Sequence, residues 1–358
     1  MLIPRRLAAT LALFGLPPGK RTPLLLSARD DSSGGHFAVG YHLAGHLAFA
    51  TPVPQRCHAV VEHPRQPLAL FVARRPGTHC YWLDIRTGRL LQTLEARPGR
   101  HFYGHAVAHA SGEWFYTTEN DTHEPGRGVI GIYRFDGQRL HYHSEVPSHG
   151  IGPHELAWMP DGETLVVANG GIRTEAESRV EMNLDAMQPS LVLMRRDGTL
   201  LSKERLSQPM NSIRHLAIGA DGTVVACQQY MGSDEDLAEL LAIKRPGKPF
   251  EAFPVAPQQL RSMAHYTASV ALHDGLRLVA VTAPRANRLF VWDLDSGALR
   301  VDAHVPDCAG VAAVAEGFVV TSGQGRCRHY DCRKASAICT PLQLPSAFWD
   351  NHLYLSAA

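Results

Sequence analysis

Histidine is the residue type that most clearly points to chemistry in this sequence. The 358 residues include 20 histidines, against 12 phenylalanines and 10 tyrosines. Neutral imidazole is a common ligand for zinc, copper, iron and nickel. Five histidines begin short apolar segments of similar pattern and are the candidate metal ligands: His58, His105, His154, His215 and His352. Their coincidence favours a site for a divalent or transition-metal ion, or for a small polar ligand.

A histidine that recurs at one position of a repeat also has a structural interpretation, because it can hold a turn by hydrogen bonding. For any single one of the five this is the simpler explanation. Polar residues at the ends of neighbouring segments favour the ligand site and are the candidate ligand-binding residues: Arg29, Asp30, Arg74, Glu119, Asn120, Asp121, Asn169, Arg214, Gln228 and Arg285. The other histidines, such as His63 and His304, fall on turns or outer segments, where we expect them to be solvated.

The elements that must position these residues form a repeat. From His154, the stretches HELAWMPDGETLVVANGG and SLVLMRRDGTLLSKERL predict four short strands with alternating apolar residues and Asp-Gly turns. The same pattern begins at or near five other positions: His58, His105, His215, Ala268 and Gly310. Four-stranded units that recur every ~40 to 60 residues are typical of β-propeller blades.

The two ends of the chain predict a seventh blade. The stretch from Pro23 matches the last three strands of a blade, and HLYLSAA from His352 matches the missing first strand. Pairing the two ends removes the sheet edges that an open ring leaves exposed. We therefore predict an all-β fold, one seven-bladed propeller over residues 23–358, closed by pairing of the C-terminal strand with the N-terminal strands.

In a propeller the first strand of each blade lines the central channel. The five histidines are therefore expected to form an arc around one mouth of this channel, with Glu155 and Arg214 turned away by strand alternation. Ala268 and Gly310 leave the arc open on one side. An insertion over residues 170–190 emerges on the same face, either as a lid over the mouth or as a surface loop.

The composition excludes several classes of protein. The chain has 35 basic and 34 acidic residues, a balance that argues against a nucleic-acid partner. No apolar stretch approaches the ~20 residues of a transmembrane helix. Cys327, Cys332 and Cys339 cluster around His329, which fits a second small metal site or, more simply, a strand pair that carries thiols.

The N-terminus has the layout of an export signal. Arg5 and Arg6 precede an apolar run over residues 7–16 and a Pro-Gly break. This pattern predicts that residues 1–22 direct the chain to the periplasm, although no A-x-A cleavage motif follows. If the signal is not functional, the protein is cytoplasmic.

Eight segments carry a resemblance to a known family: LLLSARDD, RHFYGH, TTEND, GIGPHEL, VVANGGI, NLDAMQPSL, SIRHLA and WDNHL. Together they resemble an uncharacterised family of bacterial propeller proteins, a domain of unknown function whose members typically bear a twin-arginine signal. The match runs from about Leu24 to His352 and includes Glu155 and Asp350. It implies a periplasmic protein with iron-uptake partners, because members often lie beside imelysin-type proteins. The signal departs from the family pattern, since Pro4 precedes the arginines.

Three functions follow from these observations. The first is a periplasmic propeller that binds iron or copper, or a small polar ligand, in metal uptake or handling. The second is an enzyme that uses the same site, either a metal-assisted hydrolase of the lactonase kind or an oxidoreductase, although no catalytic residue can be named. The third is a scaffold for another protein.

Overall fold

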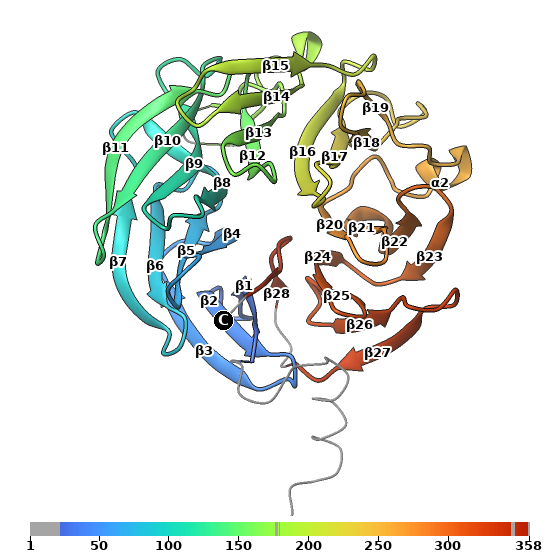
Figure 1. Cartoon of the computed structure of the whole chain (residues 1–358), viewed down its shortest axis with the longest axis horizontal. Coiled ribbons are helices and arrows are strands. Elements are labelled where there is room, and N and C mark those ends of the chain that lie inside the picture. Colours follow the sequence, from blue (N-terminus) through green and yellow to red (C-terminus); the bar gives the residue numbers. More distant parts are fainter. Residues whose placement is uncertain (1–21, 176–177, 179, 345–347, 357–358) are drawn as a thin grey trace, which may run out of the picture.

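Each sequence repeat folds into one antiparallel sheet, and seven sheets surround a central channel (Figure 1). The computed structural model describes residues 22–175, 178, 180–344 and 348–356, so the predicted export signal lies almost entirely outside the described residues. The all-β, seven-bladed propeller is confirmed. In every blade the strands follow one another from the channel outwards, because short Gly- and Asp-containing turns join neighbouring strands.

The first three blades each consist of four strands. Blade one contains β4 (Cys57–Glu62), β5 (Leu68–Ala73), β6 (His79–Asp84) and β7 (Arg89–Glu95). Blade two contains β8 (Arg100–Ala108), β9 (Trp114–Asp121), β10 (Gly128–Phe135) and β11 (Leu140–Pro147). Blade three contains β12 (Pro153–Trp158), β13 (Thr164–Asn169), β14 (Ser190–Arg195) and β15 (Leu200–Glu204), with the short helix η1 (Leu184–Ala186) in its insertion.

The next three blades repeat this arrangement. Blade four contains β16 (Asn211–Ile218), β17 (Val224–Tyr230), β18 (Leu241–Lys244) and β19 (Phe250–Ala252), followed by helix α2 (Pro257–Arg261). Blade five contains β20 (Ser269–His273), β21 (Leu278–Ala283), β22 (Arg288–Asp293) and β23 (Leu299–His304), with η2 (Pro284–Ala286) after its second strand. Blade six contains β24 (Cys308–Val314), β25 (Gly317–Ser322), β26 (Cys327–Asp331) and β27 (Ile338–Leu342).

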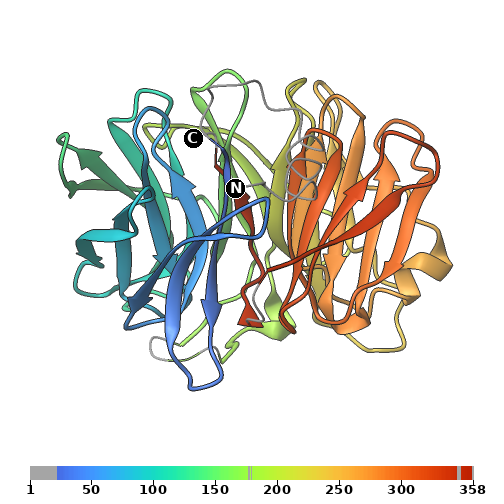
Figure 2. The same ribbon diagram turned by 90° about the horizontal axis from the view of Figure 1, so that it is seen from below.

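Blade seven is built from both ends of the chain, as predicted. Its outer strands are β1 (Leu24–Asp30), β2 (His36–His42) and β3 (Leu47–Val53). The C-terminal segment supplies the inner edge in two pieces, β28 (Phe348–Trp349) and β29 (Tyr354–Leu355), which both pair with β1. Figure 2 shows the red C-terminal segment beside the blue N-terminal strands. Residues 350–353 lie between the two pairings and are therefore free to project into the channel.

The core lies between neighbouring blades. The second strands β5, β21 and β25 are buried along their whole length, whereas the outer strand β27 is almost entirely exposed. Large aromatic side chains such as Trp82 and Trp292 fill the space between sheets. His63 also belongs to this core, since its ring lies 5.1 Å from that of Phe135. The expectation that His63 is solvated is therefore wrong, because a turn residue can fold back between two blades.

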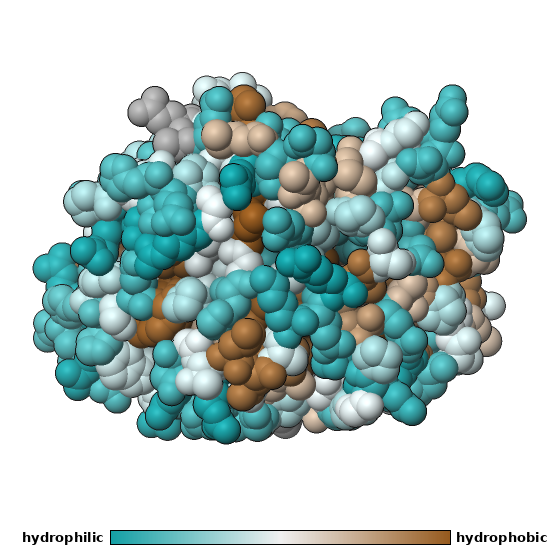
Figure 3. Space-filling view, turned by 90° about the horizontal axis from the view of Figure 1, so that it is seen from above, coloured by the Kyte–Doolittle hydropathy of each residue, from teal (hydrophilic) through white to brown (hydrophobic). Residues whose placement is uncertain are grey.

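Hydrophilic residues predominate on the face shown in Figure 3, and apolar side chains form separate small groups. None of the described helices is both long enough and apolar enough to span a membrane. The inner strands of the seven blades converge on the central channel.

Candidate functional site

An irregularity in the inner strand aims each histidine into the channel. The pairing of β4 with β5 shifts register between Cys57 and Val60, on either side of His58. Comparable shifts occur in blades two, three and four, next to or around His105, His154 and His215. A bulge of this kind redirects a side chain that regular alternation would turn to another face. The inner strand of blade five pairs without a shift and begins without a histidine.

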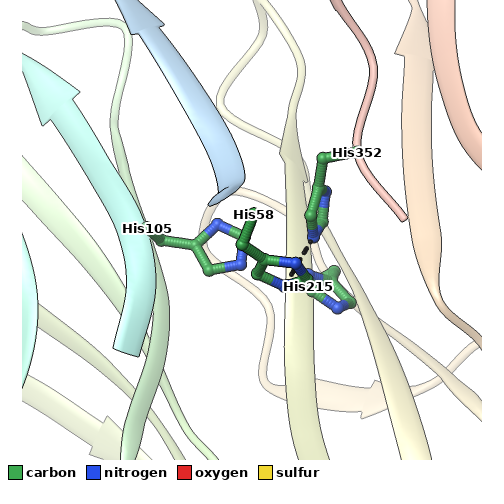
Figure 4. Close-up of side chains that lie close together, drawn as sticks. All are labelled: His58, His105, His215 and His352. Atoms are coloured by element: carbon green, nitrogen blue, oxygen red, sulfur yellow. Dashed lines mark hydrogen bonds between the residues drawn. The ribbon is translucent and has the colours of Figure 1, made fainter. Parts of the chain in front are cut away.

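The bulges of blades one, two and four, together with the C-terminal segment that carries His352, bring four histidines together in the channel. One ring nitrogen from each of His58, His105, His215 and His352 lies within 4.8 Å of the others (Figure 4). Nε2 of His58 and Nε2 of His352 are 3.2 Å apart. The fifth candidate, His154, is adjacent to this set, with its ring centroid 4.6 Å from that of His215. The structure therefore places a compact, largely buried cluster inside the channel, where the sequence predicted an open arc at its mouth.

The C-terminal segment explains the compactness. Ser27 Oγ donates a 2.6 Å hydrogen bond to the carbonyl of His352, which fixes this residue on the channel side of β1. Gly310, in blade six, allows the segment to approach, because a Cβ at this position would lie 2.8 Å from the backbone nitrogen of Leu353. The side left open in the sequence alignment is thus occupied by the segment that carries His352.

Two buried carboxylates hold the imidazole rings. Asp350 Oδ1 accepts a 2.6 Å hydrogen bond from His58 Nδ1. Glu155 lies between two rings, with Oε2 3.1 Å from His215 Nδ1 and Oε1 3.5 Å from His105 Nδ1. With Nδ1 directed at a carboxylate, the Nε2 lone pair is the one available to a metal ion. Carboxylates that orient metal-binding imidazoles in this way are a recurrent feature of metal sites.

Burial lowers the pKa of four of the channel histidines, His58, His154, His215 and His352. Desolvation lowers the pKa of His58 to about 3, even though Asp350 beside it favours the protonated form. Burial and the neighbouring imidazoles also lower the pKa values of His154, His215 and His352. A metal ion needs the unprotonated ring, so these histidines are already in the form that binds metal at neutral pH.

The carboxylates remain ionised inside the protein. Burial opposes ionisation of Asp350, but His58 and the guanidinium groups of Arg74 and Arg56 hold its pKa below the usual range. Arg56 Nε lies 2.8 Å and Arg74 Nη1 3.2 Å from Asp350 Oδ2. For Glu155 burial likewise opposes ionisation, and its contacts with His105 and His215 hold its pKa low. Two negative charges therefore stand behind the histidine cluster.

The spacing of the nitrogens suits a transition-metal ion. With metal–nitrogen bonds of about 2.1 Å, two ligands of a tetrahedral site lie ~3.4 Å apart. The 3.2 Å between Nε2 of His58 and of His352 is close to this value. His105 Nε2 is buried without a hydrogen-bond partner in the described part of the chain. The four histidines could therefore hold a metal ion after small side-chain rotations.

Among the described residues, this is the only group of three or more His, Cys, Asp or Glu side chains with such spacing. The alternative site around Cys327 and His329 is not such a group. All seven cysteines are free thiols, and Cys339 is the exposed one. The strand pair β26–β27 carries Cys327 and Cys339, Cys332 follows β26 directly, and these thiols are adequately explained as structure.

Two cavities meet the cluster from opposite ends of the inner strands. The first has a volume of ≈ 210 Å³ and is lined by His58, Arg74, Arg75, Tyr103, His154, Glu181, Arg214, His215, Gln229, Tyr266 and Asn351. The second, of ≈ 740 Å³, is reached further along the inner strands and includes His105 and Glu155 among its lining residues. Glu181 belongs to the insertion of blade three, so part of that insertion covers the mouth. Small molecules can thus approach the cluster from either end.

Two of the ten predicted ligand-binding residues line the first cavity, namely Arg74 and Arg214. Arg285 lies just behind it, with its guanidinium 4.9 Å from the ring of Tyr266. Asp30 is further out and forms an ion pair with Arg56 at 3.2 Å. Arg29 stacks on Phe37 at 4.8 Å.

The structure places the remaining five inside the blades. Glu119 accepts hydrogen bonds from Thr117 and Tyr133 at 2.6 and 2.8 Å. Its neighbour Asn120 is buried in the same strand, and Asp121 forms ion pairs with two arginines of blade two. Asn169 contacts Ser148, and Gln228 contacts a backbone carbonyl. These residues lie at the ends of the second strands, one strand away from the channel, and the contacts just named lie within or between blades.

The family model described as "Protein of unknown function (DUF1513)" matches residues 51–356. The chain belongs to this family. The DUF1513 match spans all five channel histidines together with Glu155 and Asp350. A comparison with curated proteins finds no match.

Proposed function

We propose that this DUF1513 protein binds a transition-metal ion, iron or copper, in its propeller channel. The observation that carries the proposal is the convergence of four buried imidazole nitrogens within 4.8 Å of one another, on His58, His105, His215 and His352. A buried, unpaired polar group costs free energy, and His105 Nε2 is such a group among the described residues, so a bound metal ion would remove this cost.

The donor set favours a transition metal over calcium or magnesium. Ca²⁺ and Mg²⁺ prefer oxygen ligands, whereas imidazole suits iron, copper, nickel and zinc. Glu155 and Asp350 supply charge compensation and orient the rings. His154 is the reserve ligand, since it lies beside His215 and its Nδ1 is buried without a partner among the described residues.

We place this activity in periplasmic metal uptake or handling. The support is the arginine pair before an apolar run at the N-terminus, together with the family resemblance seen in the sequence. If export does not occur, the same site would handle metal in the cytoplasm. Partners among iron-uptake proteins belong to this proposal.

A reaction at the metal is the second candidate. It is favoured by the cavity that opens on His58, His154 and His215, through which a substrate could reach the ion. A metal-assisted hydrolase or an oxidoreductase could be built on this arrangement. Turnover of a lactone or a redox substrate by the metal-loaded chain, and its loss after metal removal, would separate an enzyme from a binding protein.

The test of the proposal is the metal content of the full chain. Protein stripped with a chelator is reloaded separately with Fe²⁺, Cu²⁺, Zn²⁺ and Ni²⁺, and bound metal is measured by elemental analysis. We expect close to one ion per chain for the preferred metal and its loss in a variant with both His105→Ala and His215→Ala. The matched control carries His143→Ala and His304→Ala, two exposed histidines on outer strands. Equal loading of the two variants would refute the site.

A further inference from the structure

The first cavity beside the histidine cluster concentrates positive charge. Three of its lining residues are Arg74, Arg75 and Arg214, while Glu181 is the one carboxylate that the structure describes in its lining. Arg74 is already paired with Asp350. A cavity with this lining repels a second cation and attracts an anion.

Arg214 is the residue that most needs a ligand. It sits in the bulge of β16, between Ile213 and His215, and its Nε is buried without a hydrogen-bond partner among the described residues. Burial, and then the charge of nearby Arg75, lowers its pKa to about 10. A buried guanidinium that is incompletely paired costs free energy, and an anion in the cavity would remove much of this cost.

Neutral donors face the same space. Asn351 Nδ2 donates a 3.2 Å hydrogen bond to the hydroxyl of Tyr266, which leaves the phenolic proton available to a ligand. The guanidinium of Arg285 lies 4.9 Å from the Tyr266 ring and adds positive charge behind it. The cavity thus offers both charged and neutral hydrogen-bond donors on several sides.

We propose that this cavity binds a small oxyanion, a carboxylate or a phosphate, between Arg214 and Arg75 and in reach of the metal at His58 and His215. The metal contact rests on the function proposed above, whereas the contacts with arginine do not. The planar guanidinium matches the two oxygens of such groups. A volume of ≈ 210 Å³ is below the ~300 Å³ at which pockets for drug-sized ligands begin, so the anion is small.

Metal and anion should strengthen one another's binding. A divalent ion in the histidine cluster would add positive charge next to the arginines. Coupling between two ligands is reciprocal, so the anion should raise the affinity for the metal by the same factor as the metal raises that for the anion.

The experiment titrates the full chain, metal-free and metal-loaded, with inorganic phosphate in one arm and malonate in the other. The buffer contains no other oxyanion, and heat of binding is measured by calorimetry. We expect saturable binding of at least one probe. Arg214→Gln should weaken it by about ten- to a hundredfold, the usual effect of losing a charged hydrogen bond. Arg75→Gln provides a second variant should the buried substitution prevent folding.

Arg196→Gln is the matched control, because Arg196 is an exposed arginine of blade three that does not line the cavity. Equal affinity in the Arg214→Gln and Arg196→Gln proteins would overturn the oxyanion site, as would the absence of heat with both probes. Metal binding without anion binding would leave the metal proposal standing and refute this one. Anion binding that depends on Arg214, in a chain that takes up no metal, would support the oxyanion site and refute the metal proposal.

Discussion

Glu155 is predicted to control metal affinity although it is not itself a ligand. The perturbation is Glu155→Gln, which keeps the size of the side chain and one carbonyl oxygen but removes the charge. In the native protein Oε2 accepts hydrogen bonds from the Leu216 backbone at 2.9 Å and from His215 Nδ1 at 3.1 Å. The glutamine oxygen can take over both of these bonds, so its amide nitrogen would face His105 Nδ1, 3.5 Å from the native Oε1.

The expected loss of metal affinity follows from these contacts. His105 loses its acceptor and is no longer held with Nε2 towards the centre of the cluster, and the site loses one of two compensating charges. Removing a carboxylate that orients a metal-bound imidazole typically costs 10- to 100-fold in affinity, about 1.4 to 2.8 kcal/mol. We expect the dissociation constant for the preferred metal to rise within this range, while the stoichiometry stays near one ion per chain.

The assay is competition against a chelator of known affinity, with thermal unfolding of the metal-free protein followed in parallel. Glu163→Gln is the matched control, because Glu163 lies in the same blade and forms an exposed ion pair with Arg196. A change of less than threefold for Glu155→Gln, or an equal change for both variants, would refute the role assigned to this carboxylate.

Three further predictions follow from individual contacts. Asp350→Asn should lower the free energy of unfolding by about 3 kcal/mol. This is the lower end of the effect of breaking a buried ion pair, because the partner Arg56 is about a third exposed. Urea unfolding measures this free energy, and a change below about 1 kcal/mol would contradict the ion network. Burial raises the pKa of Glu119 above its unfolded value, so its contribution to stability is present at pH 4 and declines as the pH rises through the folded pKa. The unfolding free energy of the Glu119→Gln variant, relative to that of the native protein, should therefore increase from pH 4 to pH 8. A difference that does not change with pH would argue against the raised pKa. Gly104 has a φ of +110°, and a Cβ there would lie 2.7 Å from His58 Cδ2, so Gly104→Ala should weaken metal binding. Gly137 has a similar φ of +100° but no atom within 4 Å of such a Cβ, so Gly137→Ala should affect stability alone. Equal metal affinities in these two variants would show that His58 tolerates displacement.

The repeat made the fold predictable from the sequence. Turn signals such as Pro160–Gly162 and the alternation of the intervening strands recur in every blade, and closure by the two termini follows from the blade that lacks its first strand. The exact pairing at the closure was not predictable. β28 and β29 contact β1 through two residues each, and the interruption between them depends on contacts such as that of Ser27 with His352.

The site was predictable in its histidines but not in its carboxylates. Equivalent positions in a repeat must converge on the channel, so the five histidines could be selected from the sequence alone. Glu155 was expected to point away because residues alternate along a regular strand. The bulge at His154 breaks this alternation, and Glu155 contacts the channel histidines His215 and His105. Bulges depend on pairing between strands, which a single strand sequence does not specify.

Several polar residues at strand ends were predicted to bind the ligand, but they do not line the cavity. Residues such as Glu119 and Asn169 end second strands on the expected face, yet they bond to their own or the adjoining blade. Arg75 and Asn351 line the cavity and were not predicted, although each is the direct neighbour of a residue that the sequence singled out, Arg74 and Asp350. A shift of one position reverses the side on which a strand residue points, and sequence patterns rarely resolve that shift at strand ends.

Anomalous diffraction from crystals of the metal-loaded chain, recorded at the absorption edge of the bound metal, tests the central claim most directly. We predict one strong peak in the channel, about 2.0 to 2.2 Å from a ring nitrogen of each of His58, His105, His215 and His352. Density at that point would also show whether His154 joins the coordination. No peak between these four rings in a fully loaded crystal, or a peak at another position, would contradict the metal site.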